Sequence, residues 1–424
     1  MFYLNIKNYL IQNFNHDISW AFAYLLFEKI LRILTNSFIG LVLAYKLGFE
    51  DFGTYSVIIA TVSIFISGAS MGSEHINISE LSKKNCKDQC LASFLFVRIC
   101  VSFLFFTIFA MYLFYTKPNN IYLYLIYSLN IIIVSFNIFS HKIQANNQFK
   151  LYSRLNLIAL TASIFIKFFG FFSHMPLLYF IVSNVIDYVI LNLLFASKIN
   201  ENLLEKPNKK IAYYYLKLCL PATISTVLVT IYLRTELFMI NSLLGTKNAG
   251  IWAIINLCIS PWIVLLSSLL PIINVRLAQL VNTNQYEKKT ILFIRYLLVF
   301  SIITITINIL LANILLPLLN YKDYVNLNIA ISITSITILP LSMGLVQDMW
   351  IAHTKNTSIV LKKLIFGIPL SLFLLYYFIQ QFNLLGACIA MAISYFTTAI
   401  LMNLFFDRNF FMLQLAALGF KHER

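Results

Sequence analysis

The sequence is poor in charge. Only 11% of its 424 residues are Asp, Glu, Lys or Arg, whereas a soluble globular protein has about 25%. Hydrophobic residues make up 60% of the chain, so a water-soluble fold could not cover itself with polar groups. This shortage of charge excludes an ordinary soluble domain and indicates a protein that lies largely in a lipid bilayer. Such a protein is described by its membrane spans, each an apolar run of roughly 20 residues.

The chain also lacks the short motifs of soluble enzymes. Its two Gly-x4-Gly stretches are not followed by the Lys and Ser/Thr of a P-loop, and no Gly-x-Ser-x-Gly occurs. The six cysteines and six histidines are not placed at metal-ligand spacing. We therefore expect no catalytic residue, metal site, cofactor or disulfide. Residues 1–20 lack the pattern of a cleaved signal peptide and favour a short interfacial helix.

Twelve apolar runs are long enough to cross a bilayer, and each must be helical because unpaired backbone groups are costly in lipid. Their approximate limits are 19–44, 53–73, 91–115, 121–140, 155–173, 175–196, 218–243, 250–274, 291–316, 327–350, 361–380 and 384–406. The sequence therefore predicts an all-α integral membrane protein with twelve transmembrane helices. Pro261 and Pro340 lie within the eighth and tenth runs, which predicts bends there.

The basic residues are distributed unevenly between the loops. With the N-terminus inside, the inner segments hold 22 Lys and Arg and the outer loops hold five; the other four lie in or at the edge of spans. This split predicts that both termini are cytoplasmic. The net charge of +15 then reflects inner loops beside anionic lipid, and no segment is long enough for a basic module that binds nucleic acid.

A stretch after the first run recurs after the seventh. Leu47-Gly48-x4-Gly53-x-Tyr55 and Leu244-Gly245-x4-Gly250-x-Trp252 lie 197 residues apart. The repeat predicts two six-helix bundles in the same orientation, 1–196 and 218–406, around a central cleft. A basic cytoplasmic linker, 197–217, would join them, and 407–424 would form a cytoplasmic interfacial tail. We expect the four glycines to form tight outer turns through positive φ or close packing.

Cationic side chains within the spans are candidates for function, because each costs about 2.5–3.5 kcal/mol to insert. Arg32 and Arg234 lie on the first helix of each half, and Arg98 lies near the inner end of the third. Arg98 has the alternative of reaching the membrane surface, as does Lys29. Arg234 has no acidic residue three or four positions away. We expect it to face the cleft together with a polar stripe of Thr223, Thr226, Thr230 and Asn241.

Four carboxylates in or near the spans are candidates for carrying protons or ions: Glu28, Asp187, Glu236 and Asp348. Structural alternatives exist for three of them. Glu28 and Arg32 are one turn apart and can pair within their helix. Asp187 can make a polar contact between helices through Asn184 or Asn192. Asp348 lies near enough to an interface to be hydrated.

Three stretches resemble the bacterial polysaccharide flippases, the Wzx-type O-antigen transporters of the multidrug/oligosaccharidyl-lipid/polysaccharide (MOP) superfamily. The first is Ala44–Ser56 (AYKLGFEDFGTYS), where Tyr45 stands in place of the Arg that is usual in the family. The second runs from Glu236-Leu-Phe-Met-Ile240 through Gly245 and Gly250 to Trp252. The third is Gly386–Ala390 (GACIA). The layout of the whole chain resembles the family as well.

The resemblance implies a transporter of the bacterial cytoplasmic membrane that flips an undecaprenyl-diphosphate-linked oligosaccharide by alternating access. It implies Arg32, Arg98 and Arg234 as contacts for the diphosphate, and membrane lipids, a polysaccharide polymerase and a chain-length regulator as partners. Two other classes remain open. A multi-span glycosyltransferase or polymerase would normally have a longer outer loop than this chain has. A drug/cation antiporter of the same superfamily would favour carboxylates over arginines in the cleft.

Overall fold

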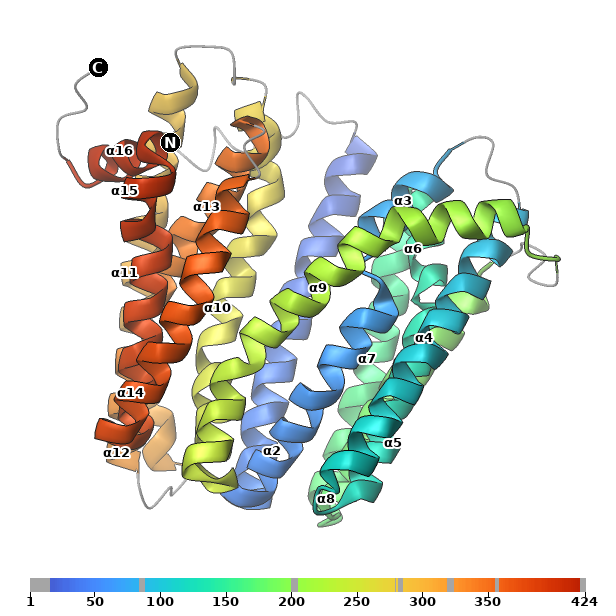
Figure 1. Cartoon of the computed structure of the whole chain (residues 1–424), viewed down its shortest axis with the longest axis horizontal. Helices are drawn as coiled ribbons and strands as arrows, with labels where there is room; N and C mark the ends of the chain where they lie inside the picture. The colour runs from blue at the N-terminus through green and yellow to red at the C-terminus, as the bar shows by residue number, and fades with distance from the viewer. Residues whose placement is uncertain are drawn as a thin grey trace. The chain divides into compact units, whose positions relative to one another are not determined.

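The structure is a computed structural model that describes residues 16–83, 88–199, 205–278, 280, 285–318, 324–354 and 358–419. This part of the chain contains helices and no strand (Figure 1). The helices are α2 (His16–Ser70), α3 (Glu74–Leu81), α4 (Asp88–Thr116), α5 (Ile121–Ile133), η1 (Val134–Asn137), α6 (Ile138–Ala145), α7 (Phe149–Phe172), α8 (Leu177–Ala196), α9 (Lys209–Leu244), α10 (Thr246–Ala278), α11 (Gln285–Leu318), α12 (Tyr324–Ser335), α13 (Ile338–Thr354), α14 (Ser358–Phe396), η2 (Thr397–Leu401), α15 (Met402–Phe406) and α16 (Arg408–Ala417). The interfacial helix expected within residues 1–20 lies largely outside the described residues.

Ten helical segments among the described residues are long and apolar enough to cross a membrane. Together they make the protein a multi-pass, all-α membrane protein, as predicted. Two are too long for one crossing: Phe27–Leu81 has 55 residues, about 80 Å of helix, against a hydrocarbon core of about 30 Å. This segment is interrupted at Gly48, and the segment Ile365–Phe406 is interrupted at Asn383. Counting each as two crossings gives twelve, and that exact number stays a prediction.

The repeated glycines have matching conformations. Gly48 and Gly245 have φ of +79° and +86°, in the left-handed region that favours glycine, and each separates two helical segments. Gly53 and Gly250 have a different role. A Cβ on Gly53 would lie 1.9 Å from the carbonyl oxygen of Thr246, and one on Gly250 would lie 1.9 Å from that of Phe49. The two repeats therefore pack backbone against backbone at a contact that we call the glycine crossing.

Two compact units make up the chain. Unit 1 contains residues 1–35 and 54–234, and unit 2 contains residues 36–53 and 235–424. Within unit 1, α5 and α7 both pack on α8, whereas in unit 2 α11 packs on α12, α13 and α16. The glycine crossing lies inside unit 2, because residues 36–53 belong to that unit. These boundaries cut α2 and α9, and the predicted division into 1–196 and 218–406 stays a prediction.

Helix α9 begins nine residues before the predicted start at 218. Asn208 caps its first turn, because its side-chain oxygen accepts a hydrogen bond from the Lys210 amide at 2.9 Å. The added turns carry Tyr215, which is buried and stacks on Phe94 of unit 1. The predicted linker 197–217 is therefore wrong at its C-terminal end. The apolar run marks where a helix enters lipid, whereas the helix itself continues beyond the lipid.

Two of the predicted spans are interrupted in the structure, and a third that contains a proline is not. The fourth predicted span is divided into α5, the 3-10 segment η1 and α6. The tenth is divided between α12 and α13, just before Pro340, as predicted. The eighth is a continuous helix, α10, through Pro261, so no break accompanies that proline.

The described part of the predicted interfacial tail folds as helix α16. Asp407 caps its N-terminus by accepting a hydrogen bond from the Phe410 amide. Phe410 and Leu413 are buried, and α16 packs on α11. Arg295 of α11 donates hydrogen bonds to the carbonyls of Ala416 and Ala417 at the other end. Part of the apolar side of this segment is therefore covered by the protein itself, and its place at the membrane interface stays a prediction.

Candidate functional site

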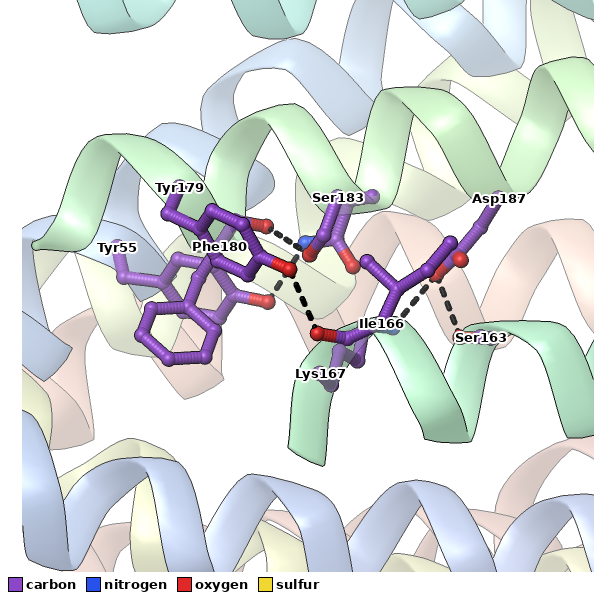
Figure 2. Close-up of polar contacts among 9 residues, drawn as sticks. Tyr55, Ser163, Ile166, Lys167, Tyr179, Phe180, Ser183 and Asp187 are labelled. Atoms are coloured by element: carbon purple, nitrogen blue, oxygen red, sulfur yellow. Dashed lines mark hydrogen bonds and ion pairs between the residues drawn. The ribbon is translucent and has the colours of Figure 1, made fainter. Parts of the chain in front are cut away.

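An ion pair joins two adjacent helices in unit 1. Lys167 on α7 donates to the Oδ2 atom of Asp187 on α8 at 2.6 Å, and Ser163, one turn before Lys167, donates to the same oxygen at 2.7 Å (Figure 2). Neither charged side chain is fully buried. Charged groups in membrane helices face the interior of a helix bundle or a water-filled cavity and are rarely exposed to lipid. We therefore take this pair as the centre of the candidate site.

Phenols and an amide surround this pair. Asn184 donates to the Tyr55 hydroxyl at 2.6 Å, so the Asp187 helix is joined to α2. Tyr179 donates to the carbonyl of Ile166 at 2.8 Å, close to the turn between α7 and α8 (Figure 2). The predicted contacts of Asp187 with Asn184 or Asn192 are wrong, because Asp187 bonds to Ser163 and Lys167 while Asn184 bonds to Tyr55.

Glu28 and Arg32 form the intrahelical pair that their spacing allows. The distance from Arg32 Nη2 to Glu28 Oε1 is 2.6 Å, and the glutamate side chain is only 3% exposed while that of the arginine is 35% exposed. The pair is not isolated from the site. Arg32 interacts electrostatically with Tyr188, which adjoins Asp187 on α8. A buried carboxylate with its cation one turn away is tolerated in a membrane helix because the pair has no net charge.

Arg98 is fully buried, contrary to the alternative that it reaches the membrane surface. Its guanidinium donates to the carbonyls of Val134 and Ser135, where α5 breaks into η1, at 2.8 and 2.9 Å. It also donates to the carbonyl of Ser70 and the hydroxyl of Ser73 at the end of α2. These contacts place one guanidinium against oxygens at the ends of two helices, where carbonyls have fewer partners within the helix. The geometry favours a structural role, and substrate contact by Arg98 stays a prediction.

Arg234 is the partly exposed cation near the middle of the membrane segment of α9. Its Nε donates to the Ser63 hydroxyl at 3.3 Å, and among the described residues no carboxylate pairs with it. It also interacts electrostatically with the phenol of Tyr127. The Nε contact leaves the two Nη groups available, which is the side of a guanidinium that binds an oxyanion in bidentate fashion.

The predicted polar stripe on α9 is divided between the units. Thr223, Thr226 and Thr230 donate to carbonyls of their own helix, and Thr223 also donates to Met71 at 3.3 Å. Thr226 lies against Gly72, so this part of the stripe faces the end of α2 within unit 1. Asn241 belongs to unit 2, where its side-chain oxygen is buried without a partner. A common orientation of the stripe toward a cleft stays a prediction.

Unit 2 contains the other two carboxylates. Glu236 hydrogen-bonds with Tyr395 of α14. Asp348 is an exposed residue of α13, in electrostatic contact with Lys363 of α14. The exposure of Asp348 agrees with the alternative that this carboxylate lies near the membrane surface and is hydrated.

A buried amide network lies beside Asp348. Lys363 donates to Gln347, which donates to Asn403 at 2.6 Å; Asn403 in turn donates to Gln414 at 3.1 Å. Asn403 and Gln414 also both donate to the carbonyl of Ala399, which lies in the π-helical segment η2. The network therefore joins α13, α14 and α16 through a helix irregularity that frees a carbonyl.

Comparison with known structures identifies the architecture. An inward-facing multidrug resistance MATE family transporter of the MOP superfamily superposes with a TM-score of 0.69 at 13% identity, covering 91% of this chain and 96% of that one. The fold is that of the MATE transporters. A eukaryotic MATE transporter matches with a TM-score of 0.66 at 13% identity, covering 94% and 98% of the two chains.

A MOP superfamily transporter from Pyrococcus furiosus, described as having a binding pocket of reverse polarity, also matches, with a TM-score of 0.59 at 13% identity, covering 93% of this chain and 96% of that one. No family model and no curated protein sequence matches the chain. The likeness to these structures shows the fold, which agrees with the predicted all-α membrane architecture, and the Wzx-type assignment stays a proposal.

Sequence reasoning missed Lys167, which it assigned to an outer loop, and it missed Tyr55 and Ser63. A signal for Lys167 was present: Ser163 and Lys167 are one turn apart on one helix, and Asn184 and Asp187 share a face of the next. Two such faces on helices joined by a short turn favour an acid–base contact. For Ser63 no signal existed, because its contact with Arg234 spans 171 residues.

Proposed function

We propose that the protein moves an undecaprenyl-diphosphate-linked oligosaccharide from the inner to the outer face of the bacterial cytoplasmic membrane. The observation that carries the proposal is the guanidinium of Arg234, with no carboxylate partner among the described residues and with its Nη groups available. Such a group in a membrane helix is costly unless a ligand or water satisfies it. A diphosphate is the anionic group that every lipid-linked oligosaccharide of this class contains, and Arg is suited to bind it.

Uncharged polar groups of unit 1 would suit a sugar-bearing substrate. Tyr127 interacts electrostatically with Arg234, and Tyr55 and Asn184 belong to the same unit. A ligand site typically combines aromatic surface with a few polar groups that orient the ligand. Arg32 would be a second diphosphate contact only if its pairing with Glu28 loosens.

In this proposal the two predicted halves work by alternating access, with both termini cytoplasmic. Glu28, Asp187, Glu236 and Asp348 are the candidates for coupling transport to an ion or proton gradient. The substrate would be passed between a glycosyltransferase system inside and a polysaccharide polymerase with its chain-length regulator outside. The protein itself would make or break no covalent bond.

Export of cationic drugs is the second candidate function. It is favoured by the names of the matching structures, which include multidrug resistance MATE transporters. It is favoured also by Glu236, an intramembrane carboxylate that has no cationic partner among the described residues. A cationic drug would need such a carboxylate, whereas a diphosphate needs Arg234.

The test compares Arg234→Ala, Arg234→Lys and a control, Arg154→Ala, at an exposed arginine near the start of α7. We expect Arg234→Ala to abolish surface polysaccharide and to accumulate lipid-linked intermediate on the inner face. Arg234→Lys should retain part of the transport, because the charge remains while the bidentate contact is lost. The control should behave like the unsubstituted protein. Normal surface polysaccharide in a membrane-inserted Arg234→Ala variant would contradict the proposal, and drug sensitivity in its place would favour the second candidate.

A further inference from the structure

Unit 1 neutralises most of the charge that it places in the membrane. Four of its ionisable side chains within the spans form two ion pairs, Arg32 with Glu28 and Lys167 with Asp187, both at 2.6 Å. A cation held this close to a carboxylate offers little attraction to a second anion, because the pair has no net charge. These two cations are therefore not available as open contacts for an acidic group.

The remaining cations of unit 1 differ in availability. Arg98 is fully buried and donates to four oxygens of helix ends, so an arriving ligand cannot reach it without breaking both ends. Lys29 lies near the start of the span Phe27–Leu81 and is long enough to extend to the membrane surface. Arg154 and Lys217 lie nearer the ends of their spans, so Arg234 is the open cation deepest within a described span of unit 1.

In unit 2, three cations in or beside the described spanning segments already have partners. Lys46 has an interaction partner, and Arg295 donates to the carbonyls that end α16. Lys363, just before the span Ile365–Phe406, donates to Gln347 and faces Asp348 and Asp407. The unit instead places carboxylates in its membrane segments, and these repel an anion.

We propose, on the basis of the function proposed above, that the transported oligosaccharide is electrically neutral and that its diphosphate is the one anionic group the protein binds. A uronic acid or other carboxylated sugar would bring a second anion into an interior whose open cation already holds the diphosphate. Glu28 and Asp187 are already paired with Arg32 and Lys167, so neither pair supplies a countercharge for it. The hydroxyl groups of a neutral sugar bring no second charge into the membrane interior, and they can exchange hydrogen bonds with the phenol of Tyr55 and the amide of Asn184.

The experiment uses the purified full-length protein in vesicles. One substrate is an undecaprenyl-diphosphate-linked tetrasaccharide of neutral hexoses, and the other is the same lipid with a glucuronic acid in place of the terminal glucose. An external pyrophosphatase that cleaves both alike reports the rate of flipping. We expect the neutral substrate to move roughly tenfold faster or more, because an unpaired charge in the membrane interior costs more than the free energy equivalent to a factor of ten.

The outcomes separate the two proposals. Equal rates, or faster movement of the acidic substrate, would overturn the inference on neutrality and leave the proposed function standing. Failure of both substrates to move with folded protein would overturn the proposed function and, with it, this inference.

Three variants test the residues that exclude acidic sugars. Asp187→Asn removes the partner of Lys167 and creates a second open cation, so the neutral-to-acidic rate ratio should fall severalfold. Lys167→Gln leaves Asp187 unpaired, and the ratio should rise. Ser163→Ala is the matched control, because it removes a hydrogen bond to the same carboxylate without changing charge, and the ratio should be unchanged. An unchanged ratio in both charge-altering variants, each folded and active, would overturn the inference.

Discussion

The two units handle charge in opposite ways. Unit 1 pairs Glu28 and Asp187 with cations and leaves Arg234 without a carboxylate partner among the described residues, whereas unit 2 places Glu236 and Asp348 in its membrane segments with Lys363 as the neighbouring cation. The difference suggests a division of labour within one chain. A unit with an open arginine suits an anionic substrate, and a unit with surplus carboxylate suits a proton or a metal cation.

The units also differ in how their helices approach one another. Unit 1 bridges two helix ends with the long side chain of Arg98, which keeps the backbones apart and fills the space between them. Unit 2 instead brings backbones into contact at the glycine crossing. The first arrangement depends on hydrogen bonds to one side chain, and the second depends on the absence of any side chain.

The largest effect is expected from Gly53→Ala, which would break the close contact in unit 2. The new Cβ would lie 1.9 Å from a carbonyl oxygen, so one of the two backbones must move, at a cost of about 3 kcal/mol. We expect a clearly lower melting temperature for the purified protein. Gly344→Ala is the control, because a Cβ there meets nothing within 4 Å, and it should be neutral or slightly stabilising. Equal melting temperatures for the two variants would show that the crossing is not a close contact.

A smaller effect is expected from Glu236→Gln, which removes the isolated carboxylate of unit 2 while keeping its shape. If unit 2 couples transport to protons, flipping should lose its dependence on an imposed pH gradient, while substrate binding at Arg234 is retained. The measurement compares initial rates with and without the gradient in vesicles. Asp51→Asn, at an exposed residue three positions after Gly48, should keep the dependence. An undiminished response in Glu236→Gln would assign coupling to another carboxylate.

The smallest effect concerns the charge balance beside Asp348. Burial lowers the pKa of Lys363 from its usual 10.5 to about 8, and the charges of Asp348 and Asp407 partly oppose this shift. Between pH 8 and 10.5 the unfolded chain holds a proton that the folded chain has released. The free energy of unfolding should therefore rise with pH between pH 8 and 10.5. Below pH 8 this group is protonated in both states and should add no pH dependence.

Lys363→Met should flatten this rise, whereas Lys362→Met, at the exposed neighbouring position, should leave it unchanged. The measurement is the melting temperature in detergent from pH 7 to 10.5. A rise of the same slope in Lys363→Met would show that another group causes it.

The sequence was a good guide to the fold and a poorer guide to the site. Apolar runs and the glycine repeat predicted the helical membrane fold, because lipid permits few alternatives and because only glycine tolerates the positive φ found at Gly48 and Gly245. The partners of Arg98 and Asp187 could not be predicted. They depend on how each helix is rotated about its axis, and a nearly uniform apolar helix carries little periodic signal to fix that rotation.

The start of α9 is one feature that the local sequence does predict. Pro207 followed by Asn208 marks a helix start, and this pair would have placed the beginning of α9 correctly. The same reasoning fails for Arg234 and Ser63, whose contact depends on tertiary packing alone.

The glycine crossing is reciprocal, or isologous. Gly53 packs against the carbonyl of Thr246 in the second repeat, and Gly250 packs against the carbonyl of Phe49 in the first repeat. Homodimers related by a two-fold axis meet in this way. In a homodimer one substitution alters both sides of such a contact at once. In a single chain each side can change separately, and Phe49, Asp51 and Phe52 already differ from Thr246, Asn248 and Ala249 at the matching positions. The two glycine repeats thus keep a reciprocal contact while the residues between their glycines can acquire different charges.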